Sequence, residues 1–257
     1  MNLLEVEGLG IAFSGLRALQ NVSFGVPEKA IFGLIGPNGA GKTTLLNCLS
    51  RFYTPDDGRV GYAGSDITRV PVHRIAPMGI CRTFQNLELF NDLSVLDNVR
   101  VGCLYRHRAN FVAELLRLPA CGRAERETIR EAHAVIEELG IEKHAQTRVG
   151  DLPFGLQKTV ELGRALAARP RLMLLDEPAA GMNAHETREL GNTIRRLRDA
   201  KGITVLLVEH DMRLVMSICD RIVVLDHGEK ICQGSPDEVR ADPAVIEAYL
   251  GREAANA

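Results

Sequence analysis

A glycine-rich loop near the N-terminus constrains the fold more than any other feature of the chain. Residues 36–43 read GPNGAGKT, directly after the apolar run AIFGLIG and directly before the helical run KTTLLNCLS. Strand, loop and helix in this order begin a parallel α/β unit. The glycines allow the backbone to curl so that successive N–H groups point at one anion. The sequence therefore predicts a phosphate-binding loop within a parallel α/β core.

The residue types of this loop suit a nucleoside triphosphate. Lys42 would place a positive charge on the β- and γ-phosphates, and Thr43 would supply a hydroxyl to Mg²⁺. A second run, LMLLDEP at 172–178, ends an apolar strand in two carboxylates. Asp176 would hold Mg²⁺ at the carboxyl edge of the sheet, largely through its water shell. Glu177 would act as general base for the attacking water.

Composition excludes several other classes of protein. The 257 residues carry 31 basic and 33 acidic side chains, a balance that argues against a nucleic-acid or acidic-membrane surface. The longest apolar runs, ITVLLV and RIVVL, are far shorter than the ~20 residues that span a bilayer. The N-terminus lacks the features of a signal peptide, and six cysteines without CxxC spacing predict reduced thiols. We therefore expect a soluble cytosolic protein that does not bind nucleic acid.

The apolar spacing predicts one domain, 1–257, in which a helical lobe interrupts the α/β core. Strand-like runs alternate with turns in the first third, and two buried-strand runs flank a helix in the last third. In an arm at 104–124, Pro119 and Gly122 are expected to break helices. The expected divisions are an α/β core at 1–85 and 151–235 with an N-terminal antiparallel β subdomain, a helical subdomain at 86–150, and a C-terminal helix and tail at 236–257.

Particular residues mark the ends of helices and turns. Ser94 is expected to cap the first helix of the lobe, and Gly202 to end the helix between the two buried strands. Residues 226–228, Asp-His-Gly, would turn a hairpin, and Ser235 would begin a closing helix. A stripe formed by Ile129, Ala132, Ile136 and Leu139 would bury one face of a helix in the lobe, and Gly140 would end that helix.

Further motifs resemble the nucleotide-binding subunit of an ABC transporter over nearly the whole chain. Gln85 in RTFQN matches the Q-loop glutamine, His210 in LLVEHDM the switch histidine, and Phe13 in FSGLRAL the aromatic residue that stacks on adenine. The segment PAAGMN lies where the family has its D-loop. The resemblance implies a P-loop NTPase fold with ATP and Mg²⁺ as ligands. The metal would be held by Thr43, Gln85 and Asp176.

The resemblance also assigns the remaining roles at this site. Glu177 and His210 would be catalytic: Glu177 would polarise the water, and His210 would bridge the γ-phosphate and the opposite subunit. The nucleotide itself would be held by Phe13, Gly36, Pro37, Asn38, Gly39, Ala40, Gly41, Lys42, Thr43 and Thr44.

The run LPFGLQ at 152–157 falls on the family's signature loop, usually LSGGQ. The helix start after it would face a γ-phosphate bound by the other subunit, so two subunits would close head to tail around two ATP molecules. Pro153, Phe154 and Leu156 depart from the common pattern; Phe154, Gly155 and Gln157 are the expected contacts. The missing serine hydroxyl removes one hydrogen bond to a charged group, worth ~1.5–3 kcal/mol. The Gly155 N–H and the helix dipole remain, so we expect a weakened but functional loop.

One branch of the family tolerates Pro or Ala followed by an aromatic residue and Gly in this loop, and it is the branch that resembles the ATPase subunits of branched-chain amino acid importers; Leu156 and the run KTVELG depart from that branch as well. The runs RTFQNLELFNDLSVLDNV, DEPAAGMN, VEHDMRLVM and GSPDEVRADPAVIEAYLG fit the same branch. The resemblance implies separate transmembrane permeases, a second ATPase subunit in a homo- or heterodimer and, indirectly, an extracytoplasmic solute-binding protein. The chain would then be peripheral, on the cytoplasmic face of the inner (plasma) membrane.

Three alternatives stay open. An ATPase of another ABC system of this branch, for urea, amide or lipopolysaccharide, would share every catalytic residue, because the cargo is bound by other subunits. A non-transport ABC ATPase acting on DNA or ribosomes usually has two cassettes or a long coiled-coil insertion, and this chain has neither. A regulatory subunit that binds ATP and hydrolyses it poorly is supported by Pro153 and Leu156, while the intact Glu177 and His210 count against it.

Overall fold

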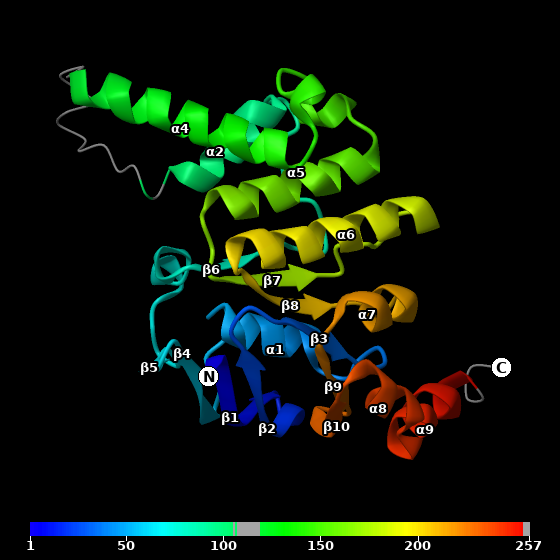
Figure 1. Cartoon of the computed structure of the whole chain (residues 1–257). Helices are drawn as coiled ribbons and strands as arrows, with labels where there is room; N and C mark the ends of the chain where they lie inside the picture. Colours follow the sequence, from blue (N-terminus) through cyan, green and yellow to red (C-terminus); the bar gives the residue numbers. More distant parts are fainter. Residues whose placement is uncertain (105, 107–118, 254–257) are drawn as a thin grey trace.

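Two sheets and a set of helices make up residues 1–104, 106 and 119–253, which the computed structural model describes (Figure 1). The strands are β1 (Asn2–Phe13), β2 (Leu16–Pro27), β3 (Ile31–Ile35), β4 (Asp57–Tyr62), β5 (Ser65–Asp66), β6 (Ile80–Arg82), β7 (Leu172–Asp176), β8 (Thr204–Val208), β9 (Arg221–Asp226) and β10 (Glu229–Gly234). The helices are α1 (Lys42–Leu49), α2 (Val95–Cys103), α4 (Pro119–Glu138), α5 (Phe154–Ala167), α6 (Ala184–Lys201), α7 (Met212–Ile218), α8 (Pro236–Ala241) and α9 (Pro243–Glu253). Short 3-10 turns lie at 72–74, 76–78, 142–144 and 149–151.

The strand order separates a parallel core from an antiparallel subdomain. In the larger sheet the order is β10-β9-β3-β8-β7-β6, and all neighbours are parallel except the β9–β10 hairpin. The smaller sheet, β2-β1-β4-β5, is antiparallel throughout. Every residue of β3, β7 and β8 is buried, as expected for parallel strands covered on both faces. The predicted fold class, an α/β P-loop core with an N-terminal antiparallel β subdomain, is confirmed.

The alternation of side chains along the central strands builds two cores. Ile31 and Leu207 pack with helices of one face, whereas Phe32 and Leu206 pack with α1 and the antiparallel sheet on the other. All four side chains have no exposed surface, and each burial stabilises the fold by about 1.5–3 kcal/mol. The larger sheet is therefore the middle layer, and the ends of its strands are held rigidly.

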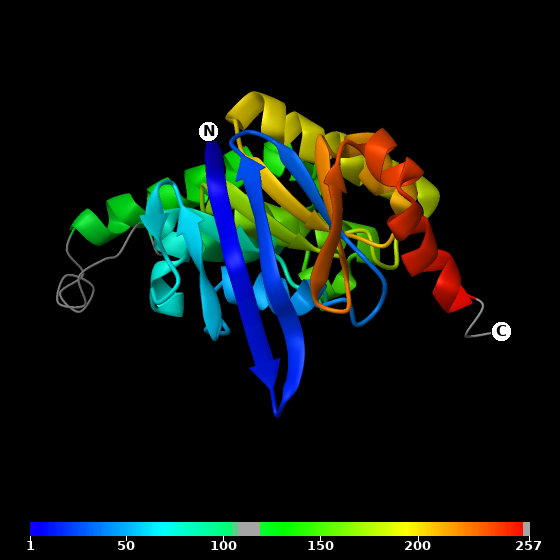
Figure 2. The ribbon, with the colours of Figure 1, turned by 90° about the horizontal axis from the view of Figure 1, so that it is seen from below.

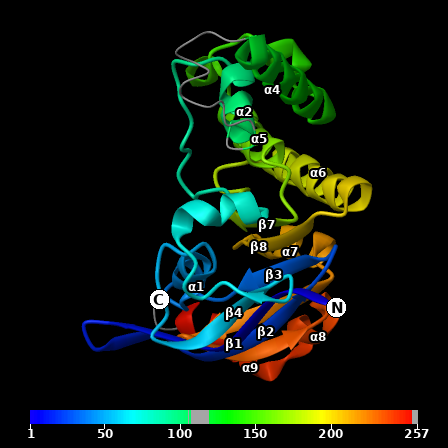
Figure 3. The same cartoon turned by 90° about the vertical axis from the view of Figure 1, so that its left-hand side faces the viewer.

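The helices α2, α4 and α5 pack on one another at the end of the molecule away from the antiparallel sheet (Figure 3). Ala132 and Ile136 on α4 and Leu139 directly after its end are buried, and Ile129 is half-buried, so these residues share one inward face as predicted. The contact between α2 and α5 is very close, because a Cβ at Gly102 would lie 2.0 Å from the carbonyl oxygen of Arg164. The helical lobe is thus a packed unit that meets the core through α5. Its boundaries at 86 and 150 stay a prediction.

The arm expected at 104–124 lies largely outside the described residues. Helix α4 begins at Pro119, a residue that suits the first turn of a helix. It continues through Gly122, so the prediction that Gly122 breaks a helix is wrong. A single glycine costs a helix only about 0.5–1 kcal/mol, and the other residues of this long amphipathic helix outweigh that cost.

Most predicted helix ends and turns are confirmed. The Ser94 hydroxyl accepts a hydrogen bond at the start of α2, and Ser235 forms a full capping box at the start of α8. Gly202 ends α6 in the left-handed conformation. The β9–β10 hairpin turns at His227 and Gly228, both with positive φ, and α8 and α9 follow beside it (Figure 2). In the part of the chain that the structure describes, no helix has the length and apolar character needed to cross a membrane.

Candidate active site

The phosphate loop is shaped by three glycines with positive φ, and at two of them a side chain would also clash. Gly36, Gly39 and Gly41 have φ of 150°, 79° and 98°. A Cβ at Gly36 would lie 2.1 Å from the carbonyl oxygen of Leu225, and one at Gly41 would lie 2.7 Å from that of Ala18. The loop is therefore seated against the ends of β9 and β2. Helix α1 begins directly after it, so its N-terminal N–H groups face the same space.

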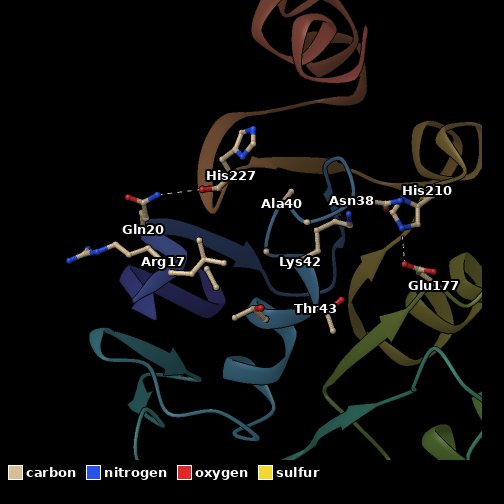
Figure 4. A pocket seen from close by; sticks show the side chains of 14 residues that line it. Arg17, Gln20, Asn38, Ala40, Lys42, Thr43, Glu177, His210 and His227 are labelled. Atoms are coloured by element: carbon tan, nitrogen blue, oxygen red, sulfur yellow. Dashed lines mark hydrogen bonds and ion pairs between the residues drawn. The ribbon is translucent and has the colours of Figure 1, made fainter. Parts of the chain in front are cut away.

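This loop forms one wall of a cavity of about 560 Å³ (Figure 4). Its lining comes from the β1–β2 hairpin, the loop with the start of α1, the ends of β7 and β8, and the β9–β10 turn. The lining residues are Leu16, Arg17, Ala18, Gln20, Asn38, Gly39, Ala40, Gly41, Lys42, Thr43, Thr44, Glu177, His210 and His227. The Lys42 ammonium donates to the carbonyl oxygens of Gly36 at 2.7 Å and Pro37 at 2.9 Å. The cavity has the volume of a small-ligand site and the donors of an anion site.

Three predicted residues meet at one side of this cavity. The Glu177 carboxylate lies 2.7 Å from Nε2 of His210, and its other oxygen accepts a hydrogen bond of 3.0 Å from the Gln85 amide. The parallel pairing of β7 with β8 brings Glu177 and His210 together, because each follows the carboxyl end of its strand. Glu177 has a φ of 48°, a conformation that costs a non-glycine residue of order 1–3 kcal/mol. Its N–H bonds to the carbonyl oxygen of Val208 at 2.9 Å, which holds it there. Strain of this kind is typical of functional positions.

Asp176 lies behind the cavity and is held by Arg82. The two side chains form an ion pair of 2.8 Å and are only 4 and 7% exposed, respectively. Arg82 also donates to the side chains of Asn47 at 2.7 Å and Ser50 at 3.0 Å, both from α1 and its C-cap, and its guanidinium lies 5.3 Å from the ring centroid of Phe84. The sequence reasoning missed Arg82. Its signal was a charged residue inside the otherwise apolar strand run GICRTF.

The three predicted Mg²⁺ ligands are therefore not equally placed. Thr43 lines the cavity, Gln85 bonds to the catalytic candidate Glu177, and Asp176 bonds to Arg82. Together they offer hydroxyl, amide and carboxylate oxygens at or behind one edge of the sheet, which is the donor set that Mg²⁺ takes alongside phosphate oxygens. The residues fit this metal, and their roles as ligands stay a prediction.

Glu209 is a second residue that the sequence reasoning missed. It is 4% exposed, and its carboxylate accepts hydrogen bonds from the N–H of Ala179 at 2.6 Å and of His210 at 3.0 Å. Burial raises the pKa of Glu209 above its ordinary value, although the backbone donors act in the opposite direction. The carboxylate thus ties the segment after Glu177 to the backbone of His210. The acidic residue at the end of a fully apolar strand, in the run LLVEH, was the available signal.

The signature run begins α5 as expected, with Pro153 at the N-cap and Phe154 at the first helical position. Phe154 is 46% exposed, and its ring covers Gly181, where a Cβ would lie 2.9 Å from the Phe154 Cε1 atom. A Cβ on Gly155 would lie 2.8 Å from the Glu186 carboxylate, so the two segments touch. The Gln157 amide donates to the carbonyl oxygen of Leu152 at 2.9 Å. None of the signature residues lines the phosphate-loop cavity of the same chain.

Phe13 does not line the cavity either. Its ring packs edge-on against Tyr53, with 5.2 Å between the centroids, and 42% of the residue is exposed. The cavity's border away from Glu177 is formed instead by Arg17, Gln20 and His227 (Figure 4). Stacking of Phe13 on adenine stays a prediction.

A sequence model of the ABC transporter family matches residues 19–180, more than half of the chain. The chain belongs to the ABC transporter family. A second model, described as branched-chain amino acid ATP-binding cassette transporter, matches residues 229–255 of this ABC protein. The predicted family and branch are confirmed.

Relatives of this ABC protein match it along nearly its whole length. It is 45% identical over 250 residues to the high-affinity branched-chain amino acid transport ATP-binding protein BraF of Pseudomonas aeruginosa, covering 97% of this chain and 98% of BraF. It is 41% identical over 249 residues to the LivG protein of the same description from Escherichia coli K12, with coverage of 97 and 98%. Among solved structures, an ATP-binding cassette of an ABC transporter in its ADP conformation is 32% identical, with a TM-score of 0.86 and coverage of 98 and 99%. A nucleotide-free cassette is 31% identical, with a TM-score of 0.85 and coverage of 97 and 99%.

Proposed function

We propose that this ABC ATPase binds ATP with Mg²⁺ and hydrolyses it to drive import of branched-chain amino acids through separate membrane permeases. The observation that carries the proposal is the Glu177 carboxylate, held between His210 and Gln85 at the edge of the phosphate-loop cavity. The names of BraF and LivG support the cargo. We therefore prefer branched-chain amino acids as the cargo over urea, an amide or a lipopolysaccharide.

Residues of the loop would hold the triphosphate. The loop curls at three glycines with positive φ, so that its free N–H groups would bind the phosphates, and Lys42, which lines the cavity, would add one positive charge. Thr43, Gln85 and Asp176 would hold Mg²⁺, which when bound neutralises charge on the phosphate oxygens. The ion pair with Arg82 fixes the direction of the Asp176 carboxylate.

Glu177 would take the proton from the attacking water. Its two oxygens are already oriented by His210 and Gln85, so little reorganisation is needed when the water is bound. As the water oxygen bonds to the γ-phosphorus, the bond to the bridging oxygen breaks and ADP leaves. A general base placed in this way contributes about 10²–10⁴ to the rate.

A second ATPase subunit would complete each site. The start of α5, with Phe154, Gly155 and Gln157, lies outside the cavity of its own chain, while its helix N-terminus suits a phosphate. We propose that it contacts the nucleotide of a partner, either a second copy or a related ATPase. ATP binding would then close the two subunits on each other, and hydrolysis would let them separate. This motion would drive transport through the permeases.

A groove beside the Gln85 loop would receive the permease. It has a volume of about 290 Å³ and lies between the core and the helical lobe, with Phe52, Val72, Phe84 and Val101 among its lining residues. Phe52 and Val72 are 55 and 47% exposed, so they offer apolar surface to a partner. Docking here would place the chain on the cytoplasmic face of the membrane. An extracytoplasmic solute-binding protein would deliver the cargo on the other side.

The proposal is tested first by ATP turnover of the purified chain beside Glu177→Gln, with sedimentation in Mg·ATP. Glu142→Gln, an exposed carboxylate in a 3-10 turn of the lobe, is the matched control. We expect Glu177→Gln to stop turnover and to accumulate as an ATP-bound dimer, and Glu142→Gln to behave as wild type. If the wild-type chain binds ATP but neither hydrolyses it nor dimerises, the proposal that this chain alone is an active ATPase is wrong. That result would favour a different second subunit that completes the site, or a regulatory role.

The cargo is tested in vesicles that contain the permeases and this ATPase. ATP on the ATPase side should drive uptake of labelled leucine or isoleucine. Uptake of urea or an amide in place of leucine would overturn the proposed cargo and leave the ATPase proposal standing.

A further inference from the structure

Two charged residues of α5 are buried without taking part in the nucleotide cavity. Lys158 and Glu161 are one helical turn apart, with Nζ 3.8 Å from a carboxylate oxygen and side chains only 2 and 3% exposed. Removing two charges from water is costly, and well-packed apolar residues are often at least as stable as a buried ion pair. A helix that had only to pack would not need this pair.

Both charges bond to the backbone of the Gln85 loop. The Glu161 carboxylate accepts a hydrogen bond from the N–H of Phe84 at 3.2 Å, and the Lys158 ammonium donates to the carbonyl oxygen of Gln85 at 3.1 Å. Helix α5 is therefore joined by two hydrogen bonds to Phe84 and Gln85. The side chain of Gln85 in turn contacts Glu177, the proposed catalytic base.

The same lysine also reaches the signature turn. Its ammonium lies 5.8 Å from the centroid of the Phe154 ring, on the face of an aromatic residue that attracts a cation. That ring covers Gly181, in the segment that follows Glu177. Phe154, a departure from the common LSGGQ pattern, thus has a defined place between Lys158 and Gly181.

We propose that Lys158 and Glu161 are positioning residues that make the Gln85 loop and the first turn of α5 move as one unit when Mg·ATP binds. The inference rests on the proposed function, because it takes Gln85 to respond to the bound nucleotide. Its consequence is that occupancy of one cavity changes the surface that the same chain offers to a partner's nucleotide. The two bonds supply a physical connection between the two surfaces, and the coupling itself is what the experiment must measure.

The test is hydrogen exchange with and without Mg·ATP in a Glu177→Gln background, which prevents turnover. The chain is kept dilute enough to sediment as a monomer, so that protection does not come from a partner. The variant is Lys158→Met combined with Glu161→Leu, since a single substitution would leave one buried charge unpaired. The control is Lys201→Met, which removes a lysine of the Lys201–Glu138 ion pair between α6 and α4, away from both loops. Thermal unfolding establishes that each variant is folded.

In the parent and the control, Mg·ATP should slow exchange at 36–44, 83–86 and 152–158. In the double variant, the slowing at 36–44 should persist, while the slowing at 152–158 should be smaller by about threefold or more. In the turnover-competent background, kcat should fall and the KM for ATP should stay unchanged. The inference would be overturned if Mg·ATP slowed exchange at 152–158 equally in the parent and the double variant. It would also be overturned if Mg·ATP did not slow exchange there in the parent. Absence of any effect at 36–44 in the parent would instead refute ATP binding, and with it the proposed function.

Discussion

The ion pair between Arg82 and Asp176 allows a prediction whose size follows from burial. Replacing Arg82 with Met keeps most of the side chain's apolar stem and removes its charge. Asp176 then stays in its place with 4% of its side chain exposed and without its cation. Breaking a buried pair from one side costs about 3–5 kcal/mol, and in a chain of this size each kcal/mol lowers Tm by about 2–4 °C. We therefore expect Arg82→Met to lower Tm by roughly 6–20 °C.

Arg59→Met is the matched control, because Arg59 forms an ion pair of the same length, 2.8 Å, with Glu7 on the surface of the antiparallel sheet. Those side chains are 63 and 50% exposed, so water screens the pair and its loss should leave Tm nearly unchanged. The assay is thermal and guanidinium unfolding of both variants beside wild type. Equal, small losses for Arg82→Met and Arg59→Met would refute the reasoning that burial makes the Asp176 pair necessary.

Further predictions concern the loop, the base and one buried carboxylate. Gly36→Ala should abolish ATP binding measured by calorimetry, because its Cβ would lie 2.1 Å from the carbonyl oxygen of Leu225. Gly122→Ala, where a Cβ would meet nothing within 4 Å, should instead raise the free energy of unfolding by about 0.5–1 kcal/mol. Glu177→Gln should lower turnover about 10²–10⁴-fold while calorimetry still detects ATP binding, and turnover near wild type would exclude Glu177 as the base. Burial raises the pKa of Glu209 above 4.5, so this group stabilises the fold below about pH 4.5 and that contribution is lost as pH rises through the raised pKa. Glu209→Gln should therefore remove part of the fall in unfolding free energy between pH 4.5 and 7, and an unchanged pH slope in guanidinium titrations would contradict this.

Local sequence patterns were enough to predict where the main site would form. The run GPNGAGKT places glycines where φ is positive, and the backbone sterics that require them act over a few residues. Glu177 and His210 follow buried strands, and parallel strands bring their carboxyl ends to one edge of a sheet. Their 2.7 Å contact is a consequence of that geometry.

One local pattern was misleading. Gly122 was expected to interrupt a helix, because glycine lowers helix propensity. The residues around it form one continuous amphipathic helix, and a packed face outweighs the cost of one glycine.

The sequence by itself determined the α/β core, the phosphate loop and the residues that follow β7 and β8, because each depends on the conformation of a short segment. Only the tertiary structure decided how the charged residues outside those motifs are paired. Arg82 meets Asp176 across 94 residues of sequence, and Lys158 meets the backbone of Gln85 across 73. Such pairs depend on which faces of distant elements pack together, and no periodicity in either segment records its partner. A buried charge raises the free energy of the fold unless a partner is present, so the structure shows the partner where the sequence shows only the charge.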